Sequence, residues 1–140
     1  MHRIFLSLAS IGVLVALAGW AFSDPQKIKV PESIAEAFSP LEPSAGTYLA
    51  DLKQFLLASD DTNEDDEPYL FLMDAKGVVS NDAIRIEGVD KMTDIESISQ
   101  DEQGNLFILS SLGLNKNGKE KKERNLFARA KRNKHSIRIS

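Results

Sequence analysis

The sequence predicts an all-β protein that follows a hydrophobic N-terminal helix. Three observations support this fold class: an uncharged apolar segment at the start, short apolar runs between turn residues thereafter, and no sustained helical period after residue 45. Short runs rich in β-branched and aromatic side chains are typical of strands that hairpins connect. The chain has 140 residues, which is enough for one domain of ordinary size.

The first segment has the features of an export signal. Arg3 precedes a run without charge over residues 4–22. Because charged groups are costly in hydrocarbon, an uncharged run of this length predicts recognition by a translocon. Under the positive-inside rule, Arg3 stays in the cytoplasm and the rest of the chain is exported. We therefore expect a periplasmic or secreted protein, or one anchored in the inner membrane by residues 4–22 if they are not removed.

The end of this segment predicts cleavage. Small residues at Ala21 and Ser23 favour cleavage between Ser23 and Asp24. We favour a signal peptide over residues 1–23. The alternatives are a retained membrane anchor, because the run is just long enough to span a bilayer, and a buried core helix of a cytoplasmic protein.

Residues 24–45 form the next segment and hold four of the five prolines. Proline fixes φ and donates no backbone hydrogen bond, so we expect an extended linker here. Within it, residues 34–38 are expected to make one helical turn at most.

Strands are expected where short apolar runs lie between turn signals. Two turn signals are the Asp74-Ala-Lys-Gly77 and Asp101-Glu-Gln-Gly-Asn105 sequences. The expected strands cover residues 54–59, 69–73, 83–87, 106–110, 126–130 and 136–139.

Three of these runs recur further along the chain. Offsets of about 52, 56 and 53 residues relate residues 55–59 to 107–111, 70–74 to 126–130, and 84–86 to 137–139. A period near 50 is typical of radial β repeats such as β-propellers. We expect about two propeller-like antiparallel blades, residues 46–90 and 91–140, the second incomplete. The alternative is a small β-sandwich in which the similarity is coincidental.

Two blades are too few to close a ring, since propellers typically use about four to eight. The sequence therefore leads to one of two expectations: the chain is part of a longer propeller, or its open sheet edges bind other copies or partner strands.

Several motifs resemble those of a known family. The motifs are Asp94-Ile-Glu-Ser-Ile98, the run from Asp101 to Ser111, Asn115-Lys-Asn-Gly-Lys119 and Glu123-Arg124. Over about residues 43–132, the chain resembles bacterial exported β-propeller-like proteins of unknown function, and more distantly the phytase-like and esterase-like propellers. For such an exported chain of two units we expect a binding or structural module of the cell envelope. The alternative is a fragment of a propeller hydrolase that uses channel carboxylates and a divalent cation.

Four acidic residues are candidates for a metal site: Asp60, Asp61, Asp94 and Glu96. In propellers the ends of the inner strands face a central channel, and two carboxylates two residues apart on a strand face the same way. Such oxygen ligands suit Ca²⁺ or Mg²⁺. The alternative, which we favour, is that Asp94 and Glu96 satisfy backbone groups at a junction between units.

Charge is unevenly distributed along the chain. Residues 24–115 contain 19 acidic and 6 basic residues, whereas residues 116–140 contain 2 acidic and 10 basic residues. Such a basic cluster can bind anionic lipid or another polyanion. Nucleic acid is not expected, because Phe127 is the one nearby aromatic residue that could stack on bases. The alternatives are a polar loop and electrostatic pairing with the acidic first unit, in this chain or a neighbour. The candidate anion-binding residues are Lys119, Lys121, Lys122 and Arg124.

The sequence gives little support for nucleophilic catalysis. It contains no cysteine, and its two histidines are His2 and His135. No Gly-x-Ser-x-Gly motif is present. The sequence therefore favours a protein without enzymatic activity and leaves the question open.

Overall fold

A computed structural model describes residues 25–39, 41–60, 62, 66–114, 117–133 and 136–140. The predicted signal segment and its cleavage residues, Ser23 and Asp24, lie outside the described residues, as do Asp61 and His135. Within the described ranges, no helix has both the length and the apolar character needed to cross a membrane.

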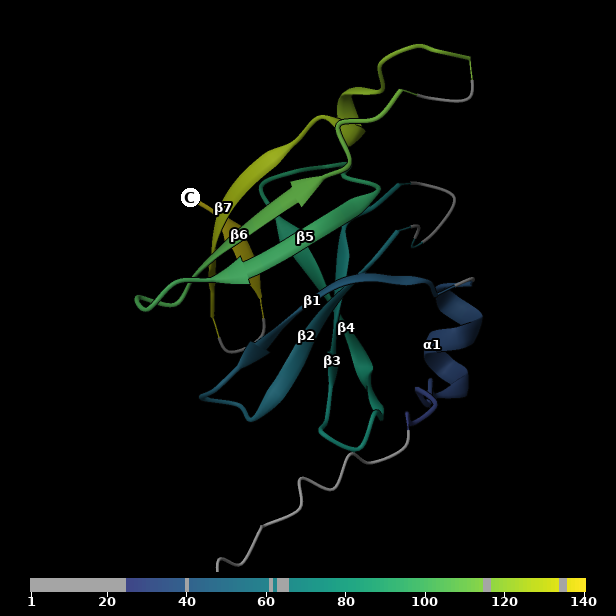
Figure 1. The fold of residues 1–140 in the computed structure, drawn as a ribbon, viewed down its shortest axis with the longest axis vertical. Coiled ribbons are helices and arrows are strands. Elements are labelled where there is room, and N and C mark those ends of the chain that lie inside the picture. The colour runs from purple at the N-terminus through teal and green to yellow at the C-terminus, as the bar shows by residue number, and fades with distance from the viewer. Residues whose placement is uncertain (1–24, 40, 61, 63–65, 115–116, 134–135) are drawn as a thin grey trace, which may run out of the picture.

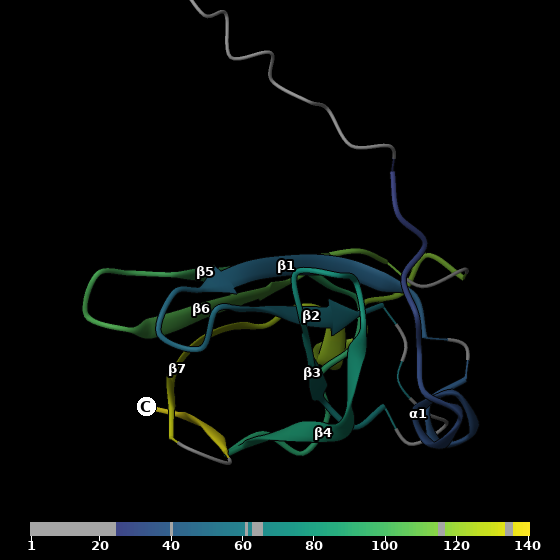
Figure 2. The ribbon, with the colours of Figure 1, turned by 90° about the horizontal axis from the view of Figure 1, so that it is seen from below.

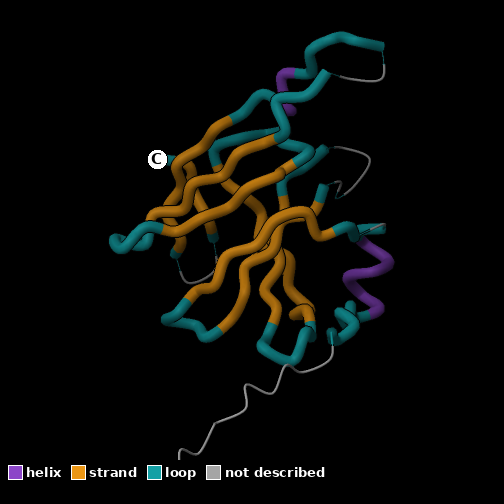
Figure 3. Tube along the Cα trace, in the orientation of Figure 1, coloured by secondary structure: helices purple, strands orange, loops and turns teal. Residues whose placement is uncertain are grey.

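Eight strands form one sheet in the order β1-β2-β3-β4-β8-β7-β6-β5 (Figures 1 and 3). One short α-helix and one 3₁₀ turn complete the described elements. Their bounds are α1 Glu32–Ala37, β1 Pro43–Leu49, β2 Gln54–Ser59, β3 Tyr69–Met73, β4 Val79–Glu87, β5 Ile95–Gln100, β6 Asn105–Ser110, η1 Lys122–Arg124, β7 Phe127–Arg132 and β8 Ile137–Ile139.

The sheet is built from two antiparallel meanders. Strands β1–β4 form the first meander and strands β5–β8 form the second. Parallel pairing of β4 with β8 joins them, and there Ile86 lies opposite Ile137 and Glu87 opposite Arg138. The Arg138 guanidinium also binds the Glu87 carboxylate, with 2.8 Å between Nε and Oε2. The two halves therefore share one continuous sheet instead of forming two separate blades.

The sheet curves until its two edge strands approach each other. Figure 2 shows β1 and β5 adjacent on one side of the molecule and β4 on the opposite side. The Ser44 hydroxyl of β1 donates a hydrogen bond to the backbone oxygen of Ile95 in β5. The result is one nearly closed sheet around a common interior.

The interior is a hydrophobic core to which every strand contributes. Period-two alternation places one set of side chains inside, because successive strand residues point to opposite faces. Two clear members are Leu56 of β2 and Ile108 of β6, both fully buried. The buried cluster comprises Leu49, Leu56, Ala58, Leu70, Ile86, Met92, Ile95, Ile98, Leu106, Ile108, Ala130 and Ile137.

A second, smaller cluster lies on the outer face of the first meander. There Ile34 of α1 packs with Leu57, Phe71 and Val79. The Phe38 ring, just after α1, contacts the Phe71 ring edge-on, with 5.2 Å between the ring centroids. The N-terminal segment therefore covers this face of the sheet.

The described residues are mostly β, as the sequence predicts, and each of the six expected runs overlaps an observed strand. The expected N-terminal hydrophobic helix lies outside the described residues. Strands β1 and β5 were not expected, because Pro43–Leu49 and Ile95–Gln100 lack a continuous apolar run. The described part of the expected extended linker, residues 25–39 and 41–45, packs against the sheet or joins it. Lys29 forms a parallel bridge with Val78, α1 packs on the sheet, and β1 begins at Pro43. Apolar residues between the prolines explain this packing.

Candidate functional site

Asp94 lies at a junction of three connections at one end of the sheet. Its backbone N–H donates to the Asp60 carbonyl, which follows β2, and its own carbonyl accepts from the Ser111 N–H, which follows β6. Asp94 has a φ of +50°, a left-handed conformation that Asp and Asn adopt more readily than most residues. This conformation directs the chain between the two neighbouring loops.

The Asp94 carboxylate is bound by a cation and a hydroxyl. Its Oδ2 lies 2.7 Å from Nη1 of Arg124 and accepts a hydrogen bond from the Ser111 hydroxyl at 3.2 Å. The Asp94 side chain is 10% exposed and that of Arg124 is 26% exposed. A pair this shielded from water has a strong electrostatic interaction, because the effective dielectric constant is low. Asp94 therefore fastens the β4–β5 connection to the β6–β7 connection.

The candidate metal ligands are arranged differently from the expected set. Asp60 and Asp94 are brought together through their backbones, whereas Glu96 is exposed on β5 and Asp61 lies outside the described residues. Among the residues that the structure places, no three His, Cys, Asp or Glu side chains form a metal-binding group. Arg124, expected to bind anions, instead binds the Asp94 carboxylate. Sequence analysis missed this pair because its members are far apart in the chain.

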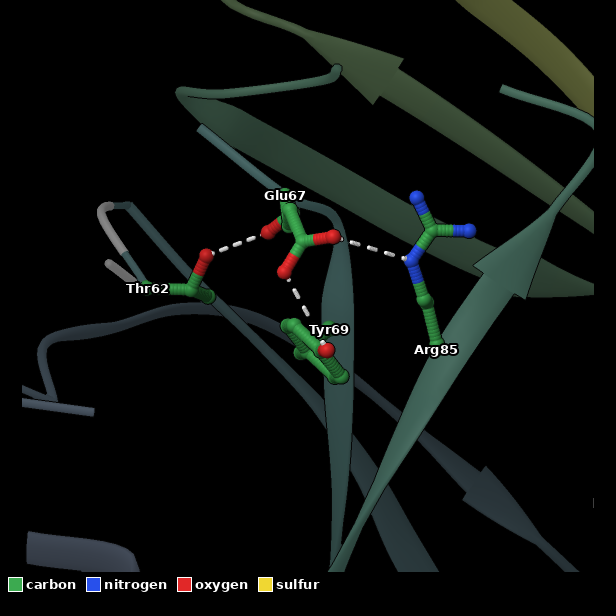
Figure 4. Close-up of polar contacts among 4 residues, drawn as sticks. All are labelled: Thr62, Glu67, Tyr69 and Arg85. Carbon is green, nitrogen blue, oxygen red and sulfur yellow. Dashed lines mark hydrogen bonds and ion pairs between the residues drawn. The ribbon is translucent and has the colours of Figure 1, made fainter. Parts of the chain in front are cut away.

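The β2–β3 connection carries a second polar cluster, shown in Figure 4. The Glu67 carboxylate accepts from the Tyr69 hydroxyl at 3.3 Å and lies 3.4 Å from Nε of Arg85. The Thr62 hydroxyl donates to the Glu67 backbone oxygen. Burial, together with the nearby Glu67 charge, raises the pKa of Tyr69. These contacts tie Thr62 and Glu67 to β3 and β4. Arg85 already engages the Glu67 carboxylate, so these four residues offer no free acid–base pair.

An open polar pocket of about 400 Å³ lies between the β1–β2 and β5–β6 turns. The Arg132 guanidinium binds the Asp51 carboxylate at its wall, and this hydrogen bond lowers the pKa of Asp51. Asp101 and Glu102 line the other side. The Asp51–Arg132 contact links the two meanders beside this pocket.

The outer face of the second meander carries an exposed aromatic side chain. Leu109 of β6 lies opposite Phe127 of β7, just as Leu57 lies opposite Phe71 in the first meander. Phe71 is 1% exposed beneath the N-terminal segment, whereas Phe127 is 68% exposed. The Phe107 ring stacks beside that of Phe127, with 6.2 Å between the centroids. This outer face, formed by Phe107, Leu109 and Phe127, was missed because strand periodicity alone does not say which apolar face is covered.

Three of the predicted anion-binding residues lie on the connection that leads into this face. Lys119 and Lys121 precede η1, and Lys122 begins it. Lys122 also lines a second open pocket of about 400 Å³, where the carboxylates of Asp90 and Glu123 balance the charges of Lys91 and Lys122. The three lysines therefore lie on the connection that leads into β7. Arg124 differs from them because it is paired with the Asp94 carboxylate.

Comparisons with protein-family models, with curated proteins and with solved structures gave no match. The functional argument therefore rests on the geometry of the chain itself.

Proposed function

We propose that this protein is an exported binding or structural module of the cell envelope, and that the outer face of the second meander is its contact surface. The exposed Phe127, which lies opposite the half-buried Leu109, carries the proposal, because the corresponding Leu57–Phe71 pair in the first meander is covered. Exposed apolar patches of this kind mark sites of interaction in soluble domains. Phe107 enlarges the patch by stacking on Phe127.

The proposal includes the export of the chain through residues 1–23 and a location in the periplasm, outside the cell, or at the inner membrane. It also treats the two meanders as two copies of one repeated unit. The equivalent placement of Leu57–Phe71 and Leu109–Phe127 supports this relationship. The alternative, a hydrolase that uses Asp94 with a divalent cation, is less favoured because Arg124 binds the carboxylate.

Site-specific photo-cross-linking in intact cells tests the contact surface. A benzophenone amino acid replaces Phe127 in the full chain, and a matched variant carries it at Tyr48, an aromatic residue 49% exposed on β1. We expect envelope adducts from position 127 and none from position 48. Equal labelling at both positions, or none at position 127, would contradict the proposal.

A further inference from the structure

The outer faces of the two meanders carry the same apolar residue types at equivalent positions. Leu57 lies opposite Phe71 in the first meander. Leu109 lies opposite Phe127 in the second. A further phenylalanine comes two residues before each leucine. The three positions are Phe55, Leu57 and Phe71 in the first meander and Phe107, Leu109 and Phe127 in the second.

In the first meander a short helical segment covers this apolar pattern. Ile34 of α1 is 2% exposed and packs with Leu57 and Phe71. The Phe38 ring, one helical turn further on, contacts the rings of Phe71 and Tyr69 edge-on. A helix of six residues is not stable alone in water, so α1 depends on this packing. The face therefore selects a helical turn that presents one aliphatic and one aromatic side chain.

The equivalent face of the second meander has no such cover. Phe127 is 68% exposed, and the described ranges contain one α-helix, which lies on the first meander. The two faces differ at one position of the pattern. Arg129 lies opposite Phe107. Met73 lies at the corresponding place opposite Phe55. A segment bound here gains fewer apolar contacts than α1 gains on the first meander, which suits a partner that exchanges.

We propose that the outer face of the second meander docks a short helical segment of a partner protein. The segment presents an aliphatic and an aromatic side chain one turn apart, as Ile34 and Phe38 do. Side chains spaced in this way are the usual anchors when a helix binds an apolar face. The first meander supports this occupant, because the same three apolar positions hold a segment of this chemistry there. The inference rests on the proposed function and names the partner chemistry of its contact surface.

A second copy of the chain's own covering segment serves as the test ligand. A flexible Gly/Ser linker joins this copy, with the sequence of residues 25–42, to Ser140 of the full chain. The Ser140 N–H donates to the Arg129 carbonyl at 2.9 Å, so the linker starts beside the face. Tethering raises the local concentration of the segment to about 1 mM, which makes weak docking measurable.

A fluorescence probe on the face reports the docking. Trp20 is the sole tryptophan, so the double variant Trp20→Phe/Phe127→Trp reports on position 127 alone. With the appended segment, we expect a blue shift of the emission and about two-fold less quenching by acrylamide. The variant Trp20→Phe/Tyr48→Trp carries the probe on β1 and is expected to show neither change.

A matched segment tests the two anchors. It carries Ile34→Ser and Phe38→Ser in the appended copy alone, so the native α1 keeps its own contacts. We expect this segment to leave the probe at position 127 as exposed as in the chain without an appended copy. Circular dichroism of all variants checks that the sheet is unchanged.

Three outcomes overturn the inference. The first is no protection of position 127 by the natural segment, and the second is equal protection by the serine segment. The third comes from sedimentation velocity of the parent chain: a dimer that Phe127→Ser abolishes would assign the face to a second copy instead of a partner helix.

The outcome also separates this inference from the proposed function. If position 127 is not protected but still cross-links to an envelope protein in cells, the helical occupant is wrong and the contact surface stands. If the segment protects position 127 but no adducts form in cells, the docking chemistry stands and the envelope function fails.

Discussion

The Asp94 carboxylate lies 2.7 Å from the Arg124 guanidinium, which joins the β4–β5 connection to the β6–β7 connection. The pair therefore fixes the base of the β6–β7 connection, which carries Leu112 and Leu114. Its contribution is testable without disturbing the backbone, because asparagine also accepts the left-handed conformation of residue 94.

Asp94→Asn is expected to lower the free energy of unfolding by about 2 kcal/mol, because it leaves a partly buried guanidinium without its counter-charge. Urea denaturation measures the change. Glu96→Gln, at an exposed position two residues away, is the matched control and should stay within about 0.5 kcal/mol of the parent. A similar stability for both variants would show that the pair contributes little.

Ile137→Ala is expected to destabilise the protein by about 3 kcal/mol, since it removes buried volume where β8 pairs with β4. Phe127→Ala is the contrasting variant, because its side chain is exposed, and a change of about 0.5 kcal/mol or less is expected. Thermal and urea unfolding compare the two. A larger loss at position 127 than at position 137 would refute the assignment of the interior core.

Phe38→Ala is expected to cost about 2 kcal/mol, because the ring packs edge-on against both Phe71 and Tyr69. The same variant should expose the outer face of the first meander and raise the binding of a hydrophobic dye such as ANS. Ser39→Ala, next to it and exposed, is the control. Unchanged dye binding would mean that the N-terminal segment does not protect this face.

Asp101→Ala is expected to make stability less sensitive to acid. The Asp101 carboxylate accepts hydrogen bonds from the side chain and backbone of Asn105, and these bonds lower its pKa below 3.8. A depressed pKa contributes stability that is present above 3.8 and is lost as pH falls through the lower, folded-state value. The stability difference between parent and variant should therefore shrink in acid. A difference that is constant with pH would contradict this role.

Calcium or magnesium at millimolar concentration is expected to leave the melting temperature unchanged, because Arg124 occupies the carboxylate of Asp94. Differential scanning calorimetry with and without the cation measures this. A rise that Asp94→Asn abolishes would instead restore the metal site predicted from the sequence.

Much of the sheet is predictable because its central strands combine apolar runs with clear turns. Asp74 and Asp101 each open a turn that ends in a glycine with positive φ, at Gly77 and Gly104. These local signals need no knowledge of the tertiary structure. Strands β1 and β5 lack such signals and are held by their neighbours, so propensity alone does not identify them.

The candidate site was harder to predict, because it depends on contacts between distant segments. Asp94 and Arg124 were both singled out from the sequence, but for different and unrelated roles. The ion pair between them depends on how the loops pack. The difference in exposure between Phe127 and Phe71 depends on where α1 packs. Period-two patterns identify apolar faces, yet they do not show which face another segment covers.

The parallel pairing of β4 with β8 also fixes the order in which the molecule can be completed during synthesis. A ribosome delivers the first meander well before residues 137–139, so β4 waits with one hydrogen-bonding edge unpaired. Such an edge is a template for strands from other chains. The growing chain is therefore prone to aggregation until β8 has been synthesised and pairs with β4. A truncated product that lacks β8 would expose this edge of β4 permanently.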